Sequence, residues 1–409
     1  MVANNKTKRT KKVGGKVIAA GGFGCVFSPA LLCSSGNGTK RNTKSISKLM
    51  TKKWALEEFT EINKIKLKLR HIINYNDFFL LRNITICKPA KLTRKDLGGF
   101  RKKCSALSND GITSTNINKH TDKLLALTMP DGGIPVDDYM VKENDLSSMS
   151  VVNFKLIELL IKGIIPMNNA HIFHNDIKDS NILVDDKGTQ IYTRLIDWGL
   201  SCTYVPNKNK ALPPSWRSRP FQYNNPYSII LFSQRFADKY QEFIKNVNGD
   251  ITSRALSSFV DDFIGPKYTK GHYKLMTQII KMITTEEPRK YIIKYIVEIL
   301  LTFKGDLRSY LDNIFIQNVD KWGLVTCYYP MLHFYHIQRT LNATDRKTHT
   351  ILKELFNYTY QSGSVKLDVG IITDYLRALD STIKINDDLS TPTRFTSTST
   401  CTTIPLDRM

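Results

Sequence analysis

Eight residues near the middle of the chain, H-N-D-I-K-D-S-N from His174 to Asn181, combine side chains that could move a proton and hold a cation. An apolar run follows them, and Asp197 comes 16 residues after Asn181. A carboxylate such as that of Asp176 can accept a proton from a hydroxyl group. The oxygens of Asn181 and Asp197 are hard ligands of the kind that Mg²⁺ takes. A lone His-x-Asp is most simply a polar loop, but the whole set indicates a reaction centre.

These residues resemble two motifs of the protein kinase superfamily, the catalytic loop H-x-D-x-K-x-x-N and the metal-binding D-F-G, which reads D-W-G here. The resemblance implies that Asp176 orients the attacking hydroxyl and accepts its proton. It implies that Lys178 stabilises the charge on the γ-phosphate of ATP, and that Asn181 and Asp197 hold Mg²⁺. Because a lysine at this place is typical of serine/threonine kinases, we expect aliphatic hydroxyls as acceptors.

A second motif lies near the N-terminus, where A-A-G-G-F-G-C-V-F spans residues 19–27. It resembles the glycine-rich loop of kinases, in which glycine lets the backbone N–H groups approach the phosphates. Ala19 stands where the family has its first glycine, Phe23 would cap the loop tip, and Val26 would lie over the adenine. The resemblance implies nucleotide contacts for six residues: Ala19, Gly21, Gly22, Phe23, Gly24 and Val26.

Lys48 matches the strand lysine that binds the α- and β-phosphates of ATP in kinases. The family holds this lysine with a carboxylate from the next helix. Glu61 is the expected partner, because Arg70 follows it about as the helix end follows the family glutamate. Glu57 and Glu58 are the alternatives.

The segment L-A-L-T-M-P-D-G-G (residues 125–133) resembles the kinase hinge, whose backbone binds the edge of the adenine. Leu127 would guard the pocket behind the adenine, and the backbone of Thr128 and Met129 would contact its edge. Pro130 falls where the family usually donates a hydrogen bond, and proline has no N–H to donate. Either the alignment is shifted by one residue or the adenine binds more weakly.

The chain also departs from the family pattern. Asn175 replaces the arginine that pairs with an activation-loop phosphate, so activity is not expected to need phosphorylation between residues 200 and 225. No A-P-E ends that segment, and the nearest match is N-P-Y at 225–227. Further on, N-V-D-K-W-G-L (318–324) resembles the kinase helix that buries an aspartate, here Asp320, against the catalytic-loop backbone. Residues 228–317 would then be an insertion that ordinary kinases lack.

The hydrophobic pattern predicts the elements that position these residues. Short strands are predicted at 16–22, 25–32 and 45–50, an amphipathic helix at 54–69, and further strands at 78–87 and 123–129. Helical periodicity follows Pro130, most clearly at 154–170. The expected fold class is α+β. The resemblance makes it a bilobal, protein-kinase-like fold, with a small antiparallel β-sheet N-lobe containing one helix (16–130) and a larger, mainly helical C-lobe (131–385).

Composition predicts the character of the two terminal segments, the charge of binding partners and the cellular compartment. Residues 1–15 are Lys-rich and predict a disordered arm that could touch nucleic acid, although a solvated tail is the simpler interpretation; residues 386–409 predict a disordered Ser/Thr-rich tail. The net charge of +22 favours acidic partners without choosing among them. No stretch suits a signal peptide or a membrane span. Seven cysteines without a CxxC pair predict reduced thiols in a cytoplasmic compartment.

Together these patterns predict a serine/threonine protein kinase that transfers the γ-phosphate of ATP to protein hydroxyls with Mg²⁺. Two alternatives stay open. A small-molecule kinase of the aminoglycoside or choline type is favoured by Trp198 and opposed by Lys178, and a catalytically weak pseudokinase could use the fold as a scaffold. The insertion and the Lys- and Asn-rich composition resemble kinases of large DNA viruses, which would place the protein in the host cytoplasm or the virion.

Overall fold

The computed structural model describes residues 15–21, 23–35, 44–143, 146–188, 190–208, 212–217, 219, 221–247, 251–265, 270–361 and 363–389. Within them the chain is an α+β protein with a small antiparallel sheet and a larger helical part. The predicted basic arm lies outside the described residues apart from Gly15, and so does the predicted tail beyond residue 389. Residues 386–389 end helix α17 (Val369–Leu389), so the tail begins later than we predicted.

The described chain divides into two compact units, of which the first contains residues 15–67 and 80–132. Its strands are β1 (Lys16–Gly21), β2 (Gly24–Ser28), β3 (Ser45–Thr51), β4 (Thr85–Cys87) and β5 (Leu124–Pro130). They form one antiparallel sheet in the order β1-β2-β3-β5-β4. The helical segments that begin in this unit are α1 (Lys52–Leu69), α3 (Phe100–Lys103), α4 (Ser105–Asn109), η1 (Ile117–Lys119) and η2 (Thr121–Lys123).

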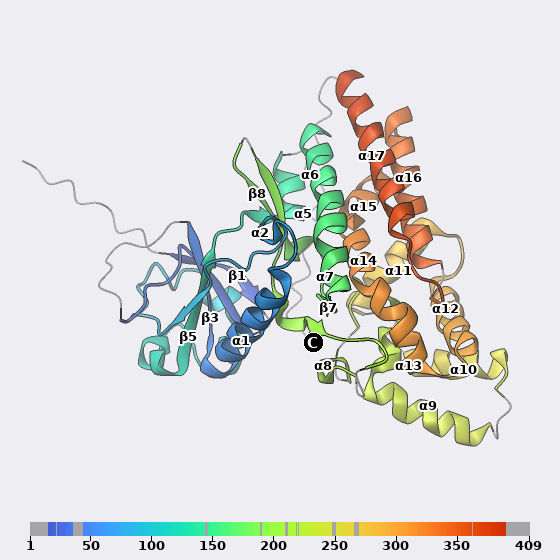
Figure 1. The fold of residues 1–409 in the computed structure, drawn as a ribbon, viewed down its shortest axis with the longest axis horizontal. Helices are drawn as coiled ribbons and strands as arrows, with labels where there is room; N and C mark the ends of the chain where they lie inside the picture. The colour runs from blue at the N-terminus through green and yellow to red at the C-terminus, as the bar shows by residue number, and fades with distance from the viewer. Residues whose placement is uncertain are drawn as a thin grey trace, which may run out of the picture. The chain divides into compact units, whose positions relative to one another are not determined.

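One face of this sheet forms the hydrophobic core of the first unit. Cys25, Leu49 and Ala126 are fully buried on it, because alternate residues of a strand point to the same face. Phe100 of α3 packs into the same core. The alternation places Lys48 on the opposite face, where α1 lies (Figure 1). The sheet therefore has one apolar face and one face that carries charge.

Most elements predicted for this unit are confirmed. The helix predicted at 54–69 is α1, which begins two residues earlier, and the strand predicted at 25–32 is β2, which ends at Ser28. The strand predicted at 78–87 is wrong over most of its length. Phe78 ends the short helix α2 (Tyr75–Phe78), and only Thr85–Cys87 is a strand. Asn83 has a left-handed backbone with φ of 52°, which interrupts an extended strand.

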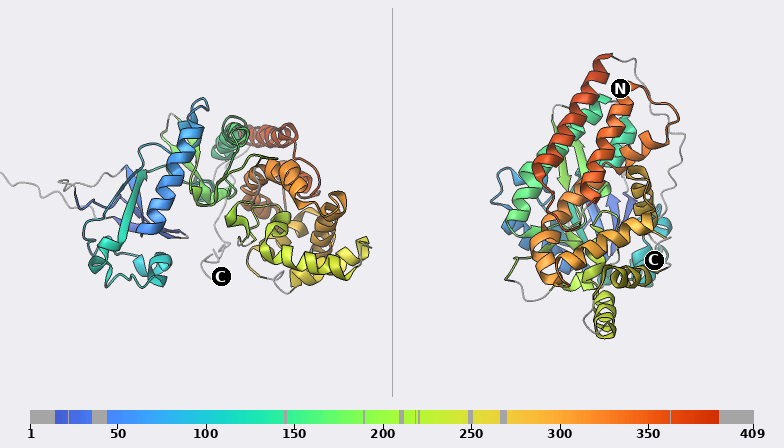
Figure 2. Two further views of the ribbon diagram at one scale, coloured as in Figure 1. Left: turned by 60° about the horizontal axis from the view of Figure 1, so that its bottom comes forward. Right: turned by 90° about the vertical axis from the view of Figure 1, so that its right-hand side faces the viewer.

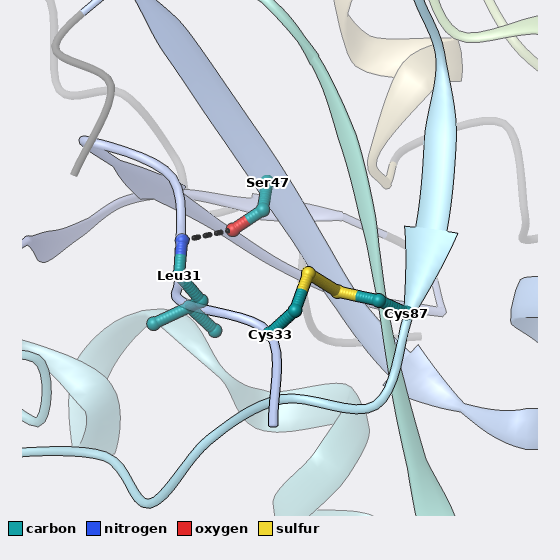
Figure 3. Close-up of a disulfide and its surroundings, with 4 residues drawn as sticks. All are labelled: Leu31, Cys33, Ser47 and Cys87. Carbon is teal, nitrogen blue, oxygen red and sulfur yellow. Dashed lines mark hydrogen bonds between the residues drawn. A yellow bond between two sulfur atoms is a disulfide. The ribbon is translucent and has the colours of Figure 1, made fainter. Parts of the chain in front are cut away.

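Two disulfides lie in the first unit. One is Cys25–Cys104, and the other is Cys33–Cys87, which Figure 3 shows. The prediction of reduced thiols is therefore wrong for these four cysteines. The bonded partners are 79 and 54 residues apart in sequence, so no short spacing could indicate the pairs. Disulfides persist in oxidising compartments. The cysteines consequently give no support to the predicted cytoplasmic compartment.

The second unit contains residues 68–79 and the described residues from 133 to 389. Its strands are β6 (Ile134–Pro135), β7 (Ile172–Phe173), β8 (Ile182–Asp186), β9 (Ile191–Leu195) and β10 (Cys202–Thr203). They form the small sheets β6-β8-β9 and β10-β7. Its α-helices besides α2 and α17 are α5 (Val136–Glu143), α6 (Leu146–Glu158), α7 (Ile165–Asn169), α8 (Pro214–Arg217), α9 (Gln234–Asn246), α10 (Ser253–Ile264), α11 (His272–Ile283), α12 (Pro288–Thr302), α13 (Leu307–Tyr310), α14 (Ile316–Thr326), α15 (Tyr329–Ile337) and α16 (Ala343–Tyr360).

The helix predicted at 154–170 is confirmed as α6 and α7, joined by a π-helical segment, η3 (Leu159–Ile164). Pro166 lies in the first turn of α7, where its missing N–H would interrupt a regular α-helix. α6 and α16 both lie beside α17 (Figures 1 and 2). The Asn153 side chain fixes the first of these contacts by donating to the Leu376 carbonyl oxygen at 2.9 Å.

Residues 228–317, predicted as an insertion, are mostly helical. They contain most of η6 (Tyr227–Phe232), helices α9 to α13, the π-helical segment η8 (Leu311–Phe315) and the first two residues of α14. Side-chain caps begin several of these helices; for example, Ser233 Oγ accepts the Phe236 N–H at 3.2 Å at the start of α9. Among the described residues, no helix is both long and apolar enough to cross a membrane.

Candidate functional site

Asp176 lies in the second unit with its carboxylate held from two sides, and the residue is 5% exposed. Its Oδ2 atom accepts hydrogen bonds from Lys178 Nζ at 3.1 Å and from Asn181 Nδ2 at 2.9 Å. Its Oδ1 atom accepts from Asn224 Nδ2 at 2.9 Å. The structure thus brings Asp176, Lys178 and Asn181 together as predicted. Three donors give this buried carboxylate one orientation, which suits a proton acceptor.

Asp320 of α14 holds the backbone of the loop that carries Asp176. Its Oδ2 accepts the His174 N–H at 2.9 Å, and its Oδ1 accepts the Asn175 N–H at 2.8 Å. Burial raises the pKa of this carboxyl, while His174 and the hydrogen bonds lower it. A Cβ at Gly323 would lie 2.6 Å from the Ile177 carbonyl oxygen, so glycine allows α14 to come this close. The predicted contact between the buried aspartate and the loop backbone is confirmed.

Asn181 and Asp197 lie at neighbouring ends of two paired strands. Asn181 precedes β8, Asp197 follows β9, and Ile196 N–H donates to the Asn181 carbonyl oxygen at 3.0 Å. Asp197 has a left-handed backbone with φ of 61°, a conformation that is uncommon outside glycine. His174 supports this turn, because its Nε2 lies 2.9 Å from the Ile196 carbonyl oxygen and its ring packs edge-on against Trp198.

The orientation of the Asn181 amide fits a cation ligand. Its Nδ2 atom donates to both the carbonyl oxygen and the carboxylate of Asp176, which leaves Oδ1 as the acceptor of this side chain. An amide oxygen and the Asp197 carboxylate are a small ligand set, and Mg²⁺ commonly completes such a set with waters and phosphate oxygens. Within the described ranges, no cluster of three or more His, Cys, Asp or Glu could hold a metal ion by itself.

A further aspartate modifies the charge next to Asn181. Burial, and after it the charge of the nearby Asp137 carboxylate, raises the pKa of Asp179 to about 7. Near neutral pH this carboxyl is therefore protonated part of the time. Asp179 adds less negative charge to the neighbourhood of Asn181 than its residue type suggests.

Sequence reasoning missed two residues that contact the Asp176 loop from the segment before η6, Asn224 and Arg219. Arg219 Nη2 donates to the Asn175 carbonyl oxygen and lies 4.0 Å from Asp176 Oδ1. Burial lowers the pKa of Arg219, and the Asp176 carboxylate opposes this effect. The only hint in the sequence was Asn175 itself: because it replaces an arginine, a cation next to the Asp176 loop could come from another part of the chain. No spacing in the sequence points to residue 219.

In the first unit, Lys48 forms a buried ion pair with Glu58 of α1. Lys48 Nζ lies 3.0 and 2.8 Å from the two carboxylate oxygens, and the side chains are 9% and 10% exposed. The prediction that Glu61 holds Lys48 is wrong, because Glu61 is exposed and pairs with Lys64 at 2.6 Å. Glu58 was the alternative one helical turn earlier. The helix rotation, which depends on where α1 begins, decides which carboxylate faces β3.

Several of the predicted nucleotide contacts share the Lys48 face of the sheet. Lys48 is directly opposite Val26 on β2 and Leu127 on β5, and Val26 is opposite Ala19 on β1. Residues opposite each other on antiparallel strands point to the same side. By alternation the Met129 side chain, two residues after Leu127, belongs to this side as well. The sheet thus gathers one cation and an apolar row on a single face.

The predicted hinge lies in β5, and the sheet distinguishes its residues. Thr128 has strand neighbours on both sides, Ser47 on β3 and Thr85 on β4. β4 begins at Thr85, which pairs with Thr128, so within the described sheet Met129 has a strand neighbour on the β3 side alone. The Met129 backbone is therefore better placed than that of Thr128 to bind a ligand. Pro130 is the last residue of β5.

The glycine-rich segment forms the turn between β1 and β2. Gly21 pairs with Gly24 at the end of the hairpin, and Gly22 lies outside the described residues. A Cβ at Gly24 would lie 2.2 Å from a backbone oxygen of β3, so sheet packing alone requires glycine there. Phe23 is 40% exposed and stacks on Trp54 of α1, with ring centroids 4.2 Å apart. The turn is thereby fixed to α1 through its aromatic residue.

In comparisons with known proteins, no protein-family model and no curated protein matches the chain.

Proposed function

We propose that this protein is an ATP-dependent kinase of the protein kinase type that phosphorylates serine or threonine hydroxyls in proteins. The observation that carries the proposal is the Asp176 carboxylate, which is buried, held by Lys178 and Asn181, and set on a loop whose backbone is fixed by Asp320. A kinase needs a positioned carboxylate for the hydroxyl, a cation for the γ-phosphate, and oxygen ligands for Mg²⁺. Lys178 and Asn181 contact Asp176, and Asp197 follows β9, the strand that pairs with β8 after Asn181.

In this proposal each residue has a distinct task. Asp176 orients the acceptor hydroxyl and takes its proton, while the hydroxyl oxygen attacks the γ-phosphorus and the bond to the β-phosphate oxygen breaks, with its electron pair leaving on ADP. Lys178 stabilises the charge on the transferred phosphoryl group. Asn181 and Asp197 hold Mg²⁺, which neutralises charge on the phosphates when it is bound.

The first unit supports the same proposal from independent residues. A kinase binds the α- and β-phosphates with a strand lysine that a helix glutamate holds in place. Lys48 and Glu58 form such a pair, and Val26 and Leu127 lie directly opposite Lys48 on the same face of the sheet, where an adenine ring would need apolar neighbours. The small antiparallel sheet with one long helix agrees with the N-lobe, and the larger helical unit agrees with the C-lobe.

The test is to incubate the purified chain with Mg·ATP and either a mixture of proteins or a panel of aminoglycosides, choline and sugars. Mass spectrometry then identifies the phosphorylated species. We expect label on protein serine or threonine, and none with Asp176→Asn. Label on small molecules alone would replace the protein-kinase proposal with its small-molecule alternative. Mg·ATP binding without any transfer would favour the pseudokinase scaffold.

A further inference from the structure

Arg219 places a buried cation next to the residue proposed as the proton acceptor. Its side chain is 2% exposed, and its Nη2 atom lies 4.0 Å from Asp176 Oδ1. The same Nη2 donates to the Asn175 carbonyl oxygen and, at 2.7 Å, to Gln222 Oε1. Removing a guanidinium from water costs several kcal/mol, so it is stable only where nearby acceptors and opposite charge compensate it. At Arg219 this compensation comes in part from the Asp176 loop.

Two residues that follow Arg219, Asn224 and Asn225, contact that loop at further points. Asn224 Nδ2 donates to Asp176 Oδ1 at 2.9 Å and to the Ile177 carbonyl oxygen at 3.0 Å. When the Asn225 amide is oriented to satisfy both of its neighbours, it donates to the Asn175 carbonyl oxygen at 3.1 Å and accepts from Arg219 at 3.3 Å. All of these contacts use side chains of the unmodified protein.

The Asn175 side chain also connects the Asp176 loop to residues 200–202 by hydrogen bonds. Its Nδ2 atom donates to the Leu200 carbonyl oxygen at 3.3 Å and to Cys202 Sγ at 3.2 Å. The backbone carbonyl of Asn175 accepts from Arg219, while its side chain holds the segment after Asp197. One residue therefore connects the Asp176 loop to two stretches of the chain. Position 175 holds asparagine and not a phosphate-binding arginine, and the cation next to this loop is the guanidinium of Arg219.

Some hydrogen-bond donors of the Arg219 guanidinium have no acceptor in the described part of the chain, so burying an arginine at this position has a cost. Its Nε and Nη1 atoms are buried and have no hydrogen-bond partner among the described residues. If Arg219 served packing alone, an apolar side chain would fill the space without burying these donors. A lysine would keep the charge but would lose the planar fork that places Nη2 against two acceptors.

We propose that Arg219 is a positioning residue that acts through Asp176 and the Asn175 carbonyl, and that it holds residues 221–225 on the Asp176 loop without phosphorylation. This inference rests on the proposed kinase function and adds its regulation. The active arrangement is built into the chain by an internal arginine. A phosphate on residues 200–225 is then unnecessary for turnover.

The experiment compares Arg219→Gln and Arg219→Lys with Arg217→Gln, a matched control because Arg217 is an exposed arginine two residues away. We expect Arg219→Gln to lower kcat about 10- to 100-fold through misplacement of Asp176, with KM for ATP within about twofold. Arg219→Lys should recover part of kcat, and Arg217→Gln should behave like the wild type. Hydrogen exchange of the 221–225 amides should speed up in Arg219→Gln and remain unchanged in the control.

Three outcomes would overturn the inference: wild-type kcat in Arg219→Gln, unchanged exchange of the 221–225 amides in that variant, or loss of wild-type activity after phosphatase treatment. If Arg219→Gln fails to fold, Asn224→Ala tests the same tie from the other side, and a kcat equal to that of the wild type would count against it. Wild-type protein that transfers phosphate to no acceptor would refute the proposed function. The exchange comparison would still decide whether Arg219 holds the segment.

Discussion

The two units hold their candidate site residues by different means. The first holds Lys48 in a buried ion pair with Glu58, and both disulfides of the described chain lie in this unit. The second fixes Asp176 through a network of hydrogen bonds, and its two described cysteines, Cys202 and Cys327, are free thiols. Covalent bonds limit the unfolded state of the first unit, whereas the second holds Asp176 through hydrogen bonds between buried polar groups. The two units should therefore respond to different perturbations.

The largest effect should come from the aspartates of the second unit. We expect Asp197→Ala to abolish Mg²⁺-dependent turnover, and Asp176→Asn to lower kcat about 10²- to 10⁴-fold while Mg·ATP still binds. In the proposed mechanism Asp197 would hold the metal and Asp176 would position the hydroxyl, so only the loss of Asp197 should weaken ATP binding. Turnover assays and Mg·ATP thermal shifts separate the two. Asp238→Asn, on the exposed side of α9, is the matched control, and near-normal turnover by Asp176→Asn would contradict the assignment.

A second effect distinguishes two glutamates on the same helix of the first unit. Glu58→Gln leaves the Lys48 charge buried without its partner, so we expect a loss of about 3 kcal/mol in the free energy of unfolding and weaker Mg·ATP binding. Glu61→Gln removes an exposed pair and should cost about 0.5 kcal/mol or less. Urea unfolding and Mg·ATP titration of both variants provide the comparison. Equal effects of the two substitutions would mean that the buried pair does not hold Lys48.

The contrast between Glu58 and Glu61 shows where sequence reasoning stops. Within a motif the chain itself sets the distances, so Asp176, Lys178 and Asn181 could be predicted to lie together from their spacing. The carboxylate for Lys48 comes from another element. Residues 58 and 61 lie on the same side of a helix, and the starting point and rotation of α1 choose between them.

Contacts over longer distances in sequence were harder still. The two disulfides join cysteines 79 and 54 residues apart, and Arg219 reaches Asn175 across 44 residues. Hydrophobic periodicity does not predict such pairs, because the path of the chain between the two residues determines whether they meet. The Asp320 contact was predictable for another reason: a resemblance supplied the long-range partner that spacing alone could not. The α+β class followed directly from the change of periodicity near Pro130.

The disulfides allow the first unit to be tested separately. Cys25 and Cys104 are fully buried, whereas Cys33 and Cys87 are partly exposed. A thiolate must reach the sulfur that it attacks, so a mild dithiol reductant should open Cys33–Cys87 before Cys25–Cys104. Loss of each bond should reduce the free energy of unfolding by about 2–4 kcal/mol. Alkylation followed by mass spectrometry gives the order of opening, and simultaneous opening of both bonds would contradict the prediction.

The smallest effect concerns a buried lysine of the second unit, Lys321, whose Nζ donates to the Leu367 carbonyl oxygen at 2.5 Å. Burial lowers the pKa of Lys321 to about 8 in the folded protein, below about 10.4 for an unfolded lysine. Between these values the unfolded chain binds more protons than the folded one, so this residue makes the folded state more stable as pH rises.

Integrated from pH 7 to 9.5, the Lys321 contribution is about 1–2 kcal/mol. Lys321→Met should remove this rise, while Lys347→Met, which changes an exposed lysine of α16, should keep it. The measurement is urea unfolding of the wild type and both variants across this pH range. The difference between wild type and variant isolates Lys321 from tyrosines that titrate above it. A difference that does not change with pH would mean that Lys321 keeps an ordinary pKa and that water reaches its ammonium group.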